Sequence, residues 1–231
     1  MNAADIKRTV GELVVERPSR SRVLESFRID YCCGGRKPLE VACREAGAEV
    51  ERVVEALERA DAAPRGRDHD RAWGEAESRE LVEHIVSVHH ELLRRELPRV
   101  GGLIEKVVRA HGSKHAELPE VQATFHELYE ELESHMAKEE NILFPAILDR
   151  AAGRWQGSFD GPIGMMEHEH VLAGQALEAL RRLTRDYAPP ADACNTYRAR
   201  LDGLAELEHD LHQHIHEENN ILFPRFASPR R

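Results

Sequence analysis

The sequence contains few aromatic residues and no long uninterrupted apolar segment. Phe, Trp and Tyr make up only 5% of the 231 residues, and runs of Val, Ile and Thr are scarce. Ala, Leu, Glu and Arg dominate instead, and because these residues favour helices, the composition predicts an all-α protein. No apolar segment approaches the roughly 20 residues that a helix needs to span a bilayer, so we expect no membrane partner.

Excess positive charge and a disulfide framework are also missing. The formal net charge is −10, which argues against a nucleic-acid partner. The four cysteines, Cys32, Cys33, Cys43 and Cys194, do not show the spacing of a small disulfide-rich domain. The first residues contain no apolar stretch typical of a secretory signal. We therefore expect a cytoplasmic protein, in a compartment that keeps thiols reduced.

The chain is long enough for one helical bundle and a small additional domain. Residues 1–60 predict a small helical domain, with a turn at DYCCGG and an amphipathic helical segment over 38–59. Residues 61–77 contain Pro, Gly and mixed charge without periodicity, which is typical of a linker. Residues 78–231 contain long helical segments with modest loops, and this pattern predicts an antiparallel up-down four-helix bundle.

The helical segments of the predicted bundle are separated by glycine, proline and other loop residues. We expect them over about 78–111, 119–151, 163–187 and 193–226. Pro98 lies inside the first segment, where it predicts a kink or an irregular turn.

Two nearly identical segments occur in the second and fourth predicted helices. HMAKEENILFP begins at His135 and HIHEENNILFP begins at His214, and seven of the eleven positions are identical. His90 precedes His135 by 45 residues, and His170 precedes His214 by 44 residues. This matched spacing indicates a duplicated helical hairpin, which would bring equivalent residues together around a pseudo-twofold axis.

Apolar residues at steps of three and four place a histidine on the core side of each predicted helix. In the second helix these core positions are Phe125, Leu128, Leu132, His135, Glu139 and Ile142. In the fourth they are Leu204, Leu207, Leu211, His214, Glu218 and Ile221. In the first and third they are Val82, Val86, His90, Leu93 and Leu97, and Met166, His170, Ala173, Leu177 and Leu180.

A single histidine on an apolar face is usually a core residue with a satisfied ring, but four histidines and two carboxylates in one layer are different. Burying one unpaired carboxylate costs several kcal/mol, and the net stability of a domain is only about 5–15 kcal/mol. Bound metal would neutralise these groups directly. Because a closed zinc site takes four ligands, a larger set of nitrogen and oxygen donors predicts two metals, with iron favoured over manganese.

The sequence therefore predicts a non-haem di-iron centre bridged by an oxide or hydroxide. The predicted metal ligands are His90, His135, Glu139, His170, His214 and Glu218. His89 is the main alternative to His90 because it is the adjacent residue. The remaining helical histidines, including His216, are expected to be solvated or to support the ligands, and His111 and His115 are expected to have no specific role.

These motifs together resemble a known family. DYCCGG, SHMAKEENILFP, MEHEH and HEENNILFP are similar to segments of the iron–sulfur cluster repair proteins, the repair-of-iron-centres family, within the hemerythrin-like superfamily. The resemblance covers essentially the whole chain and implies that the six predicted ligands bind two irons, with both glutamates bridging. The pattern of oxygen-carrying hemerythrins differs, because it has a further histidine in the third helix at the position where this chain has Gly174.

The resemblance implies a di-iron protein that helps to repair iron–sulfur clusters damaged by nitrosative or oxidative stress, by supplying iron. Its expected partners are damaged iron–sulfur proteins and small ligands such as nitric oxide or oxygen. A di-iron nitric oxide reductase and an oxygen or nitric oxide sensor are the alternatives. The oligomeric state, monomer or homodimer, stays open.

Cys32 and Cys33 are the second candidate for chemistry. Adjacent cysteines form a disulfide only through a strained ring, and the glycines that follow let the backbone turn and expose both sulfurs. A helix beginning near Pro38 would favour their thiolates. The pair would take up iron, a nitrosyl group or sulfur, or dock on a client, unless it only packs a tight turn. Cys43 could join the pair, and Cys194 is expected to be incidental.

Overall fold

The computed structural model describes residues 5–62 and 73–228. These residues form helices and connections, with no strand beyond a single antiparallel bridge between Thr9 and Pro38. The all-α class is therefore confirmed. No helix in the described ranges is both long and apolar enough to cross a bilayer.

The chain divides into two compact units. The first comprises Met1–Val82, Ser158–Asp160 and His212–Arg231, and the second comprises Glu83–Gly157 and Gly161–Leu211. The predicted linker at 61–77 lies partly outside the described residues, because 63–72 are not described. The predicted domain boundaries stay a prediction.

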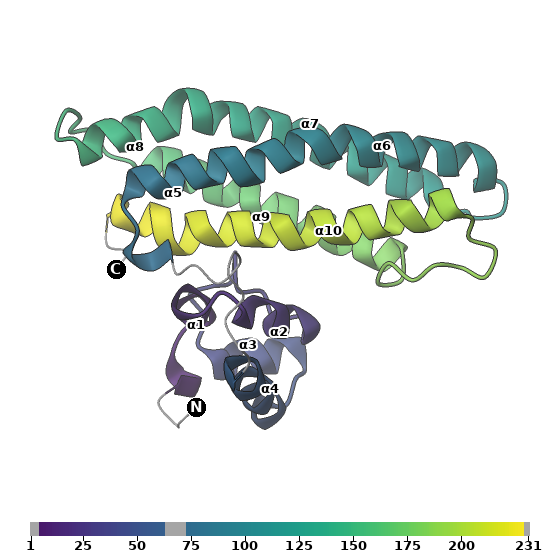
Figure 1. The fold of residues 1–231 in the computed structure, drawn as a ribbon, viewed down its shortest axis with the longest axis horizontal. Helices are drawn as coiled ribbons and strands as arrows, with labels where there is room; N and C mark the ends of the chain where they lie inside the picture. The colour runs from purple at the N-terminus through teal and green to yellow at the C-terminus, as the bar shows by residue number, and fades with distance from the viewer. Residues whose placement is uncertain (1–4, 63–72, 229–231) are drawn as a thin grey trace. The chain divides into compact units, whose positions relative to one another are not determined.

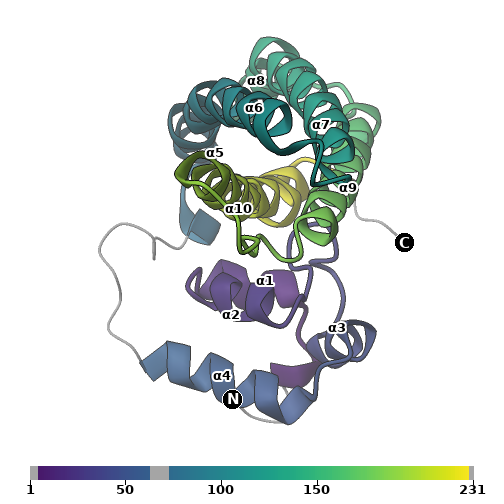
Figure 2. The same cartoon turned by 90° about the vertical axis from the view of Figure 1, so that its right-hand side faces the viewer.

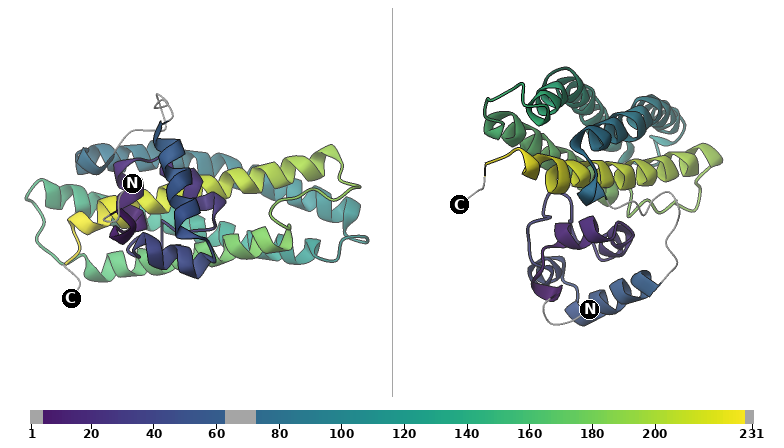
Figure 3. Two further views of the ribbon diagram at one scale, coloured as in Figure 1. Left: turned by 90° about the horizontal axis from the view of Figure 1, so that it is seen from below. Right: turned by 60° about the vertical axis from the view of Figure 1, so that its left-hand side comes forward.

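The second unit is a bundle of long helices connected by loops (Figure 1). Figures 2 and 3 show α6, α7, α9 and α10 side by side, which confirms the predicted helical bundle. Its elements, some of which continue into the first unit, are α5 (Ser78–His84), η3 (Ile85–His90), α6 (Glu91–His111), α7 (Leu118–Lys138), η4 (Glu139–Leu143), α8 (Phe144–Ala151), α9 (Asp160–Leu183) and α10 (Asn195–Glu217).

Most helix boundaries agree with the expectation, and the differences have local causes. The helix α6 continues through Pro98. The helix α9 ends at Leu183, earlier than the predicted end at 187, because Arg185, Asp186 and Tyr187 all have positive φ angles of 53–58°. A backbone with positive φ cannot continue a right-handed helix.

A π-helical turn interrupts the long helices beside the predicted metal ligands. The turns are η3, which ends at His90, η4, which begins at Glu139, and η5 (Glu218–Leu222), which begins at Glu218. Such a turn adds one residue to the helical repeat and is frequent at functional sites. The residues after it therefore move to a different face of the helix.

The π-turns displace two predicted core positions. Ile142 follows Glu139 at the expected spacing, but its side chain is 66% exposed, whereas the neighbouring Leu143 is only 4% exposed. Similarly, Val86 is half-buried and Ile85 is fully buried. The uninterrupted helix α9 keeps the predicted pattern, and all five of its predicted core residues are buried.

The first unit contains the N-terminal helices and the C-terminal end of the chain. Its helices are η1 (Asp5–Lys7), α1 (Val10–Glu16), α2 (Arg20–Ser26), α3 (Leu39–Ala46), α4 (Val50–Ala62), η2 (Trp73–Glu75), η5 and η6 (Phe223–Arg225). A capping box between Thr9 and Glu12 begins α1. The single amphipathic segment expected over 38–59 is in fact two helices, because Gly47 adopts φ 68° and ends α3.

Candidate metal centre

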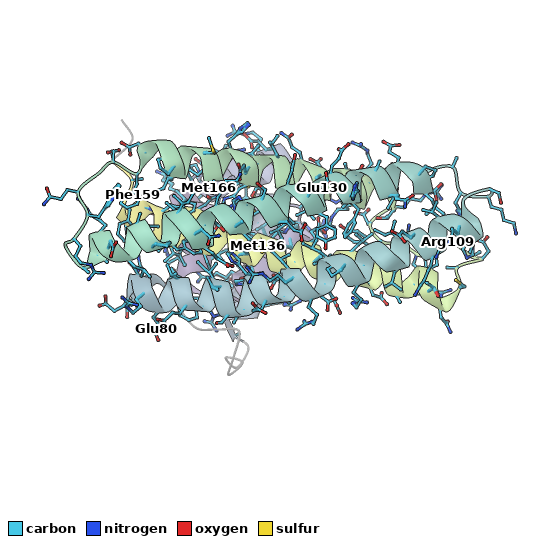
Figure 4. The ribbon with its side chains drawn as sticks, turned by 90° about the horizontal axis from the view of Figure 1, so that it is seen from above. Glu80, Arg109, Glu130, Met136, Phe159 and Met166 are labelled. Carbon is cyan, nitrogen blue, oxygen red and sulfur yellow. The ribbon has the colours of Figure 1, made fainter. Side chains whose placement is uncertain are left out.

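Four of the predicted ligands lie within the bundle unit. They are His90 at the end of η3, His135 on α7, Glu139 at the start of η4 and His170 on α9. All four are at most 3% exposed. Figure 4 labels two buried methionines on the same helices, Met136 on α7 and Met166 on α9.

The carboxylate of Glu139 lies between two imidazoles. Its Oε2 atom is 3.3 Å from Nε2 of His90, and its Oε1 atom is 3.3 Å from Nε2 of His135. The Nε2 atoms of His135 and His170 face each other at 3.1 Å. Ligand atoms of His135, Glu139 and His170 all lie within 4.8 Å of one another, so these residues could hold a metal ion together.

Two further glutamates orient these histidines. Glu140 Oε1 is 2.6 Å from Nδ1 of His90, and Glu169 Oε2 is 2.8 Å from Nδ1 of His135. An ionised carboxylate only accepts hydrogen bonds, so each Nδ1 atom donates its proton to its glutamate. In the neutral imidazole this leaves Nε2, the atom that faces Glu139, with the lone pair that could bind a metal. Carboxylates support metal-bound histidines in the same way in many metal sites.

Basic side chains keep both supporting glutamates ionised. Arg94 donates to both carboxylate oxygens of Glu140 at 2.6 and 2.7 Å, and Lys138 donates to Glu169. Burial raises the pKa of each carboxyl, but the hydrogen bonds from the histidine and the basic residue outweigh burial, so both pKa values lie below the ordinary glutamate value. Sequence reasoning did not identify Glu140 and Glu169, although each is adjacent in sequence to a predicted ligand.

His89 is buried as well, but it has a different partner. Its side chain is 6% exposed, and its Nδ1 atom lies 2.9 Å from Oδ1 of Asp210. His90, rather than His89, contacts Glu139. The geometry of the bundle unit therefore favours His90 as the ligand.

The other two predicted ligands lie in the first unit. His214 on α10 and Glu218 at the start of η5 are both fully buried, and Nε2 of His214 is 3.2 Å from Oε1 of Glu218. This pair repeats the contact between His135 and Glu139, at the same spacing and beside the same kind of π-turn. The duplicated motif therefore has the same local structure in both copies.

The donor atoms in both units are imidazole nitrogens and carboxylate oxygens. This combination suits iron, manganese and zinc, and carboxylates that can bridge favour a pair of iron ions in a helical bundle. A buried carboxylate without a neutralising cation is costly, so the chemistry of these residues fits a bound metal.

Asp30 organises the turn that carries the two cysteines. Its Oδ1 atom accepts the backbone N–H groups of Cys32 and Cys33 at 3.0 and 2.9 Å, and its Oδ2 atom accepts that of Gly34 at 2.8 Å. The two sulfurs are 3.9 Å apart. Asp30, Cys32 and Cys33 form another group whose donor atoms lie within 4.8 Å of one another.

The expected activation of Cys32 as a thiolate is not found. The helix α3 begins at Leu39, near the expected position. The hydrogen bond with Cys33, burial, and the negative charge of Asp30 nevertheless raise the pKa of Cys32 well above the ordinary thiol value. Cys43 is fully buried within α3, and burial raises the pKa of its thiol too.

The cysteine turn is attached to η5 within the first unit. Asn220 donates from Nδ2 to the backbone oxygens of Tyr31 and Cys32 at 3.2 and 3.0 Å. A Cβ atom at Gly35 would lie 2.1 Å from Oδ1 of Asn220, so this close approach requires glycine. His216 is 3% exposed and packs edge-on against Tyr31 at 5.4 Å between ring centroids. It therefore supports the cysteine turn, a role that its sequence position did not specify.

Comparisons with known proteins match both parts of the chain. Residues 81–226 match the hemerythrin HHE cation binding domain, and residues 6–61 match a domain of unknown function, DUF542. The chain is 40% identical over 217 residues to the iron–sulfur cluster repair protein YtfE of Enterobacter sp. (strain 638), covering 94% of each chain.

Other relatives carry similar names. The chain is 38% identical over 219 residues to the YtfE protein of Musicola paradisiaca, covering 95% of this chain and 96% of the relative. It is 37% identical over 224 residues to a probable iron–sulfur cluster repair protein of Haemophilus influenzae, covering 96% and 97%.

Proposed function

Because the chain belongs to the family of iron–sulfur cluster repair proteins, we propose that it restores damaged iron–sulfur clusters by supplying iron from its bundle. The observation that carries this proposal is the contact of one buried carboxylate, Glu139, with two imidazoles at 3.3 Å. The clients are iron–sulfur proteins whose clusters have lost iron. We place this repair in the cytoplasm, where free thiols persist.

The proposed centre holds two iron ions between six residues. They are His90, His135, Glu139, His170, His214 and Glu218. The duplicated motif supports this set, because both copies place a buried histidine and glutamate four residues apart beside a π-turn. In this proposal both glutamates and an oxide or hydroxide would bridge the two ions, and the four histidines would supply the remaining protein ligands.

The side chains of this chain determine how firmly the iron is held. Glu140 and Glu169 orient the imidazoles of His90 and His135 and increase their basicity as ligands. Each iron has few protein ligands compared with the six of an octahedral site, so exogenous ligands have access to it. The bound iron supplies the ion that a damaged cluster lacks, and it is therefore the cargo of the protein.

Cys32 and Cys33 have a proposed role in the transfer of iron. Their sulfurs lie 3.9 Å apart beside the carboxylate of Asp30, an arrangement that offers a temporary binding site for iron. Because the pKa of Cys32 is raised, a bound cation would have to displace its proton. Weak binding of this kind suits transfer better than storage.

Transfer of iron to a damaged client tests the proposed function. Iron-loaded protein, prepared without oxygen, is mixed with a dehydratase whose cluster has been damaged by peroxide, and recovery of dehydratase activity is followed. We expect faster recovery than with the same amount of free ferrous iron, and loss of this advantage in Glu139→Gln. Glu133→Gln, which changes an exposed glutamate on the preceding helix α7, is the control. Equal recovery with free iron would refute the proposal.

A further inference from the structure

Four further metal-binding side chains gather at one end of the bundle unit. His111 is the last residue of α6, and His115 lies in the connection to α7. Asp192 and Cys194 lie in the connection between α9 and α10. Figure 1 shows these two connections at the same end of the bundle. Two segments distant in sequence thus bring together two imidazoles, a carboxylate and a thiol.

Three of these side chains are close enough to share one ion, and Cys194 contacts one of the three. His111, His115 and Asp192 offer ligand atoms within 4.8 Å of one another. Nε2 of His115 lies 3.2 and 3.3 Å from the two carboxylate oxygens of Asp192, and Nε2 of His111 lies 3.4 Å from Sγ of Cys194.

Two of these separations are close to the edges of a tetrahedral zinc site. With zinc–nitrogen or zinc–oxygen bonds of about 2.1 Å and a zinc–sulfur bond of about 2.3 Å, tetrahedral geometry separates nitrogen from oxygen by about 3.4 Å and nitrogen from sulfur by about 3.6 Å. The contacts of His115 with Asp192 and of His111 with Cys194 lie within about 0.2 Å of these values. Cys194 lies outside the group of three whose donor atoms are within 4.8 Å of one another, so its side chain would have to turn toward them to complete a four-ligand site.

Neighbouring residues orient both imidazoles. Each ring packs against Tyr197, with ring centroids 5.5 Å apart in both cases. Glu117 Oε1 lies 3.3 Å from Nδ1 of His115, so His115 has a carboxylate on the side opposite the proposed ion. This is the same supporting arrangement that Glu140 and Glu169 provide in the candidate centre.

The scaffold beneath this group is a packed apolar cluster. Its buried members are Val107, Leu118, Tyr197 and Leu201, and partly buried Ala193 packs against them. Since Ala193 lies between Asp192 and Cys194 in sequence, its packing fixes the backbone that presents both ligands. Asp192 and Cys194 are themselves exposed, so an ion can enter from solvent.

This group is distinct from the candidate iron centre. His111 follows His90 by 21 residues, which corresponds to about 30 Å along a helix. Figure 4 shows this separation within the bundle unit: Arg109, two residues before His111, is near one end, whereas Met136, next to His135, is near the middle.

We propose that His111, His115, Asp192 and Cys194 bind one zinc ion, which cross-links the two connections at this end of the bundle. The mixture of imidazole, carboxylate and thiolate donors is typical of zinc rather than of the oxygen-rich sites of magnesium or calcium. Binding releases the thiol proton of Cys194 to solvent. The ion stabilises the folded bundle because the two connections are far apart in the unfolded chain.

Cobalt(II), a spectroscopic substitute for zinc, tests the site in the full-length, iron-loaded protein. We expect one added cobalt per chain, with a thiolate-to-cobalt absorption band in the near ultraviolet that zinc then abolishes. Cys194→Ser should lose the band. His115→Ala should weaken zinc binding by at least about 100-fold, measured by calorimetry. His126→Ala, which alters an exposed histidine on α7, should bind like the unmodified protein.

Cys32 and Cys33 provide a result that could contradict the proposed zinc site. The cobalt band should persist when Cys32 and Cys33 are both replaced by serine. If the band instead disappears in that variant and remains in Cys194→Ser, the bound ion lies at the cysteine turn and the proposal is wrong. Equal zinc affinity in His115→Ala and His126→Ala would also overturn it. Neither result depends on repair activity, so the zinc proposal and the proposed function fail independently.

Discussion

Glu140 Oε1 lies 2.6 Å from Nδ1 of His90, and Nη2 of Arg94 donates to both oxygens of the same carboxylate. A residue on η4 therefore sets the orientation of a histidine on η3. Only the first copy of the repeated motif has this supporting carboxylate, because the position equivalent to Glu140 in the second copy is Asn219.

Glu140→Gln should lower the affinity for iron without unfolding the bundle. Loss of a carboxylate that supports a metal-bound histidine typically costs 10- to 100-fold in affinity. We expect a loss of about this size, measured by competition with a ferrous chelator. Glu133→Gln provides the exposed control on α7. Unchanged iron retention in Glu140→Gln would show that the charge of Glu140 does not strengthen His90 as a metal ligand.

The π-turn η4 predicts opposite behaviour for two adjacent apolar residues. Leu143→Ala should destabilise the protein by about 2–5 kcal/mol because Leu143 is 4% exposed. Ile142→Ala should change stability by less than about 0.5 kcal/mol because Ile142 is 66% exposed. Denaturant unfolding measures both values. Equal losses in the two variants would mean that the helix passes through this region without the π-turn.

Asp30→Ala should make Cys32 more reactive. The negative charge of Asp30 contributes to the raised pKa of this thiol, and its removal should lower that pKa. At a pH below the pKa, a larger thiolate fraction then reacts, so the pH profile of alkylation should move to lower pH. Mass spectrometry of the modified peptide follows Cys32, and Asp202→Ala is an exposed control. An unmoved profile would exclude an electrostatic effect of Asp30.

The two copies of the motif offer a matched pair at their shared asparagine. Asn220→Ala removes hydrogen bonds to the backbone oxygens of Tyr31 and Cys32 and should cost about 1–3 kcal/mol. Asn141→Ala removes a bond to Ala137 on its own exposed helix face and should cost less than about 0.5 kcal/mol. Thermal unfolding distinguishes them, and similar midpoints would contradict an attachment through Asn220.

Much of the architecture was predictable because helical periodicity and the duplicated motif are local properties of the sequence. The spacing of His135 and Glu139 correctly predicted a buried pair on one helix face. The phase after Glu139 was not predictable in the same way, because a π-turn depends on packing around the helix. Ile142 is therefore exposed although the α-helical repeat placed it in the core.

Contacts between separate helices were the part of the site that was hardest to predict from the sequence. The pairing of Glu169 with His135 requires two helices to lie side by side at one register, which neither segment specifies alone. The meeting of His115 with Asp192, 77 residues apart, likewise depends on which loops share an end of the bundle. By contrast, the break at Gly47 had a visible signal, since glycine commonly ends helices.

The two copies of the motif differ in solvent exposure, and this difference predicts what removing the N-terminal residues would do. Ile142 in the first copy is 66% exposed, whereas the equivalent Ile221 is 7% exposed within the unit in which α1 packs on η5. Removing residues 1–62 would therefore uncover an apolar strip on the last helix and leave the amide of Asn220 without its backbone acceptors. A truncated protein of this kind should be prone to aggregation, and its solubility would be a poor measure of the bundle's own stability.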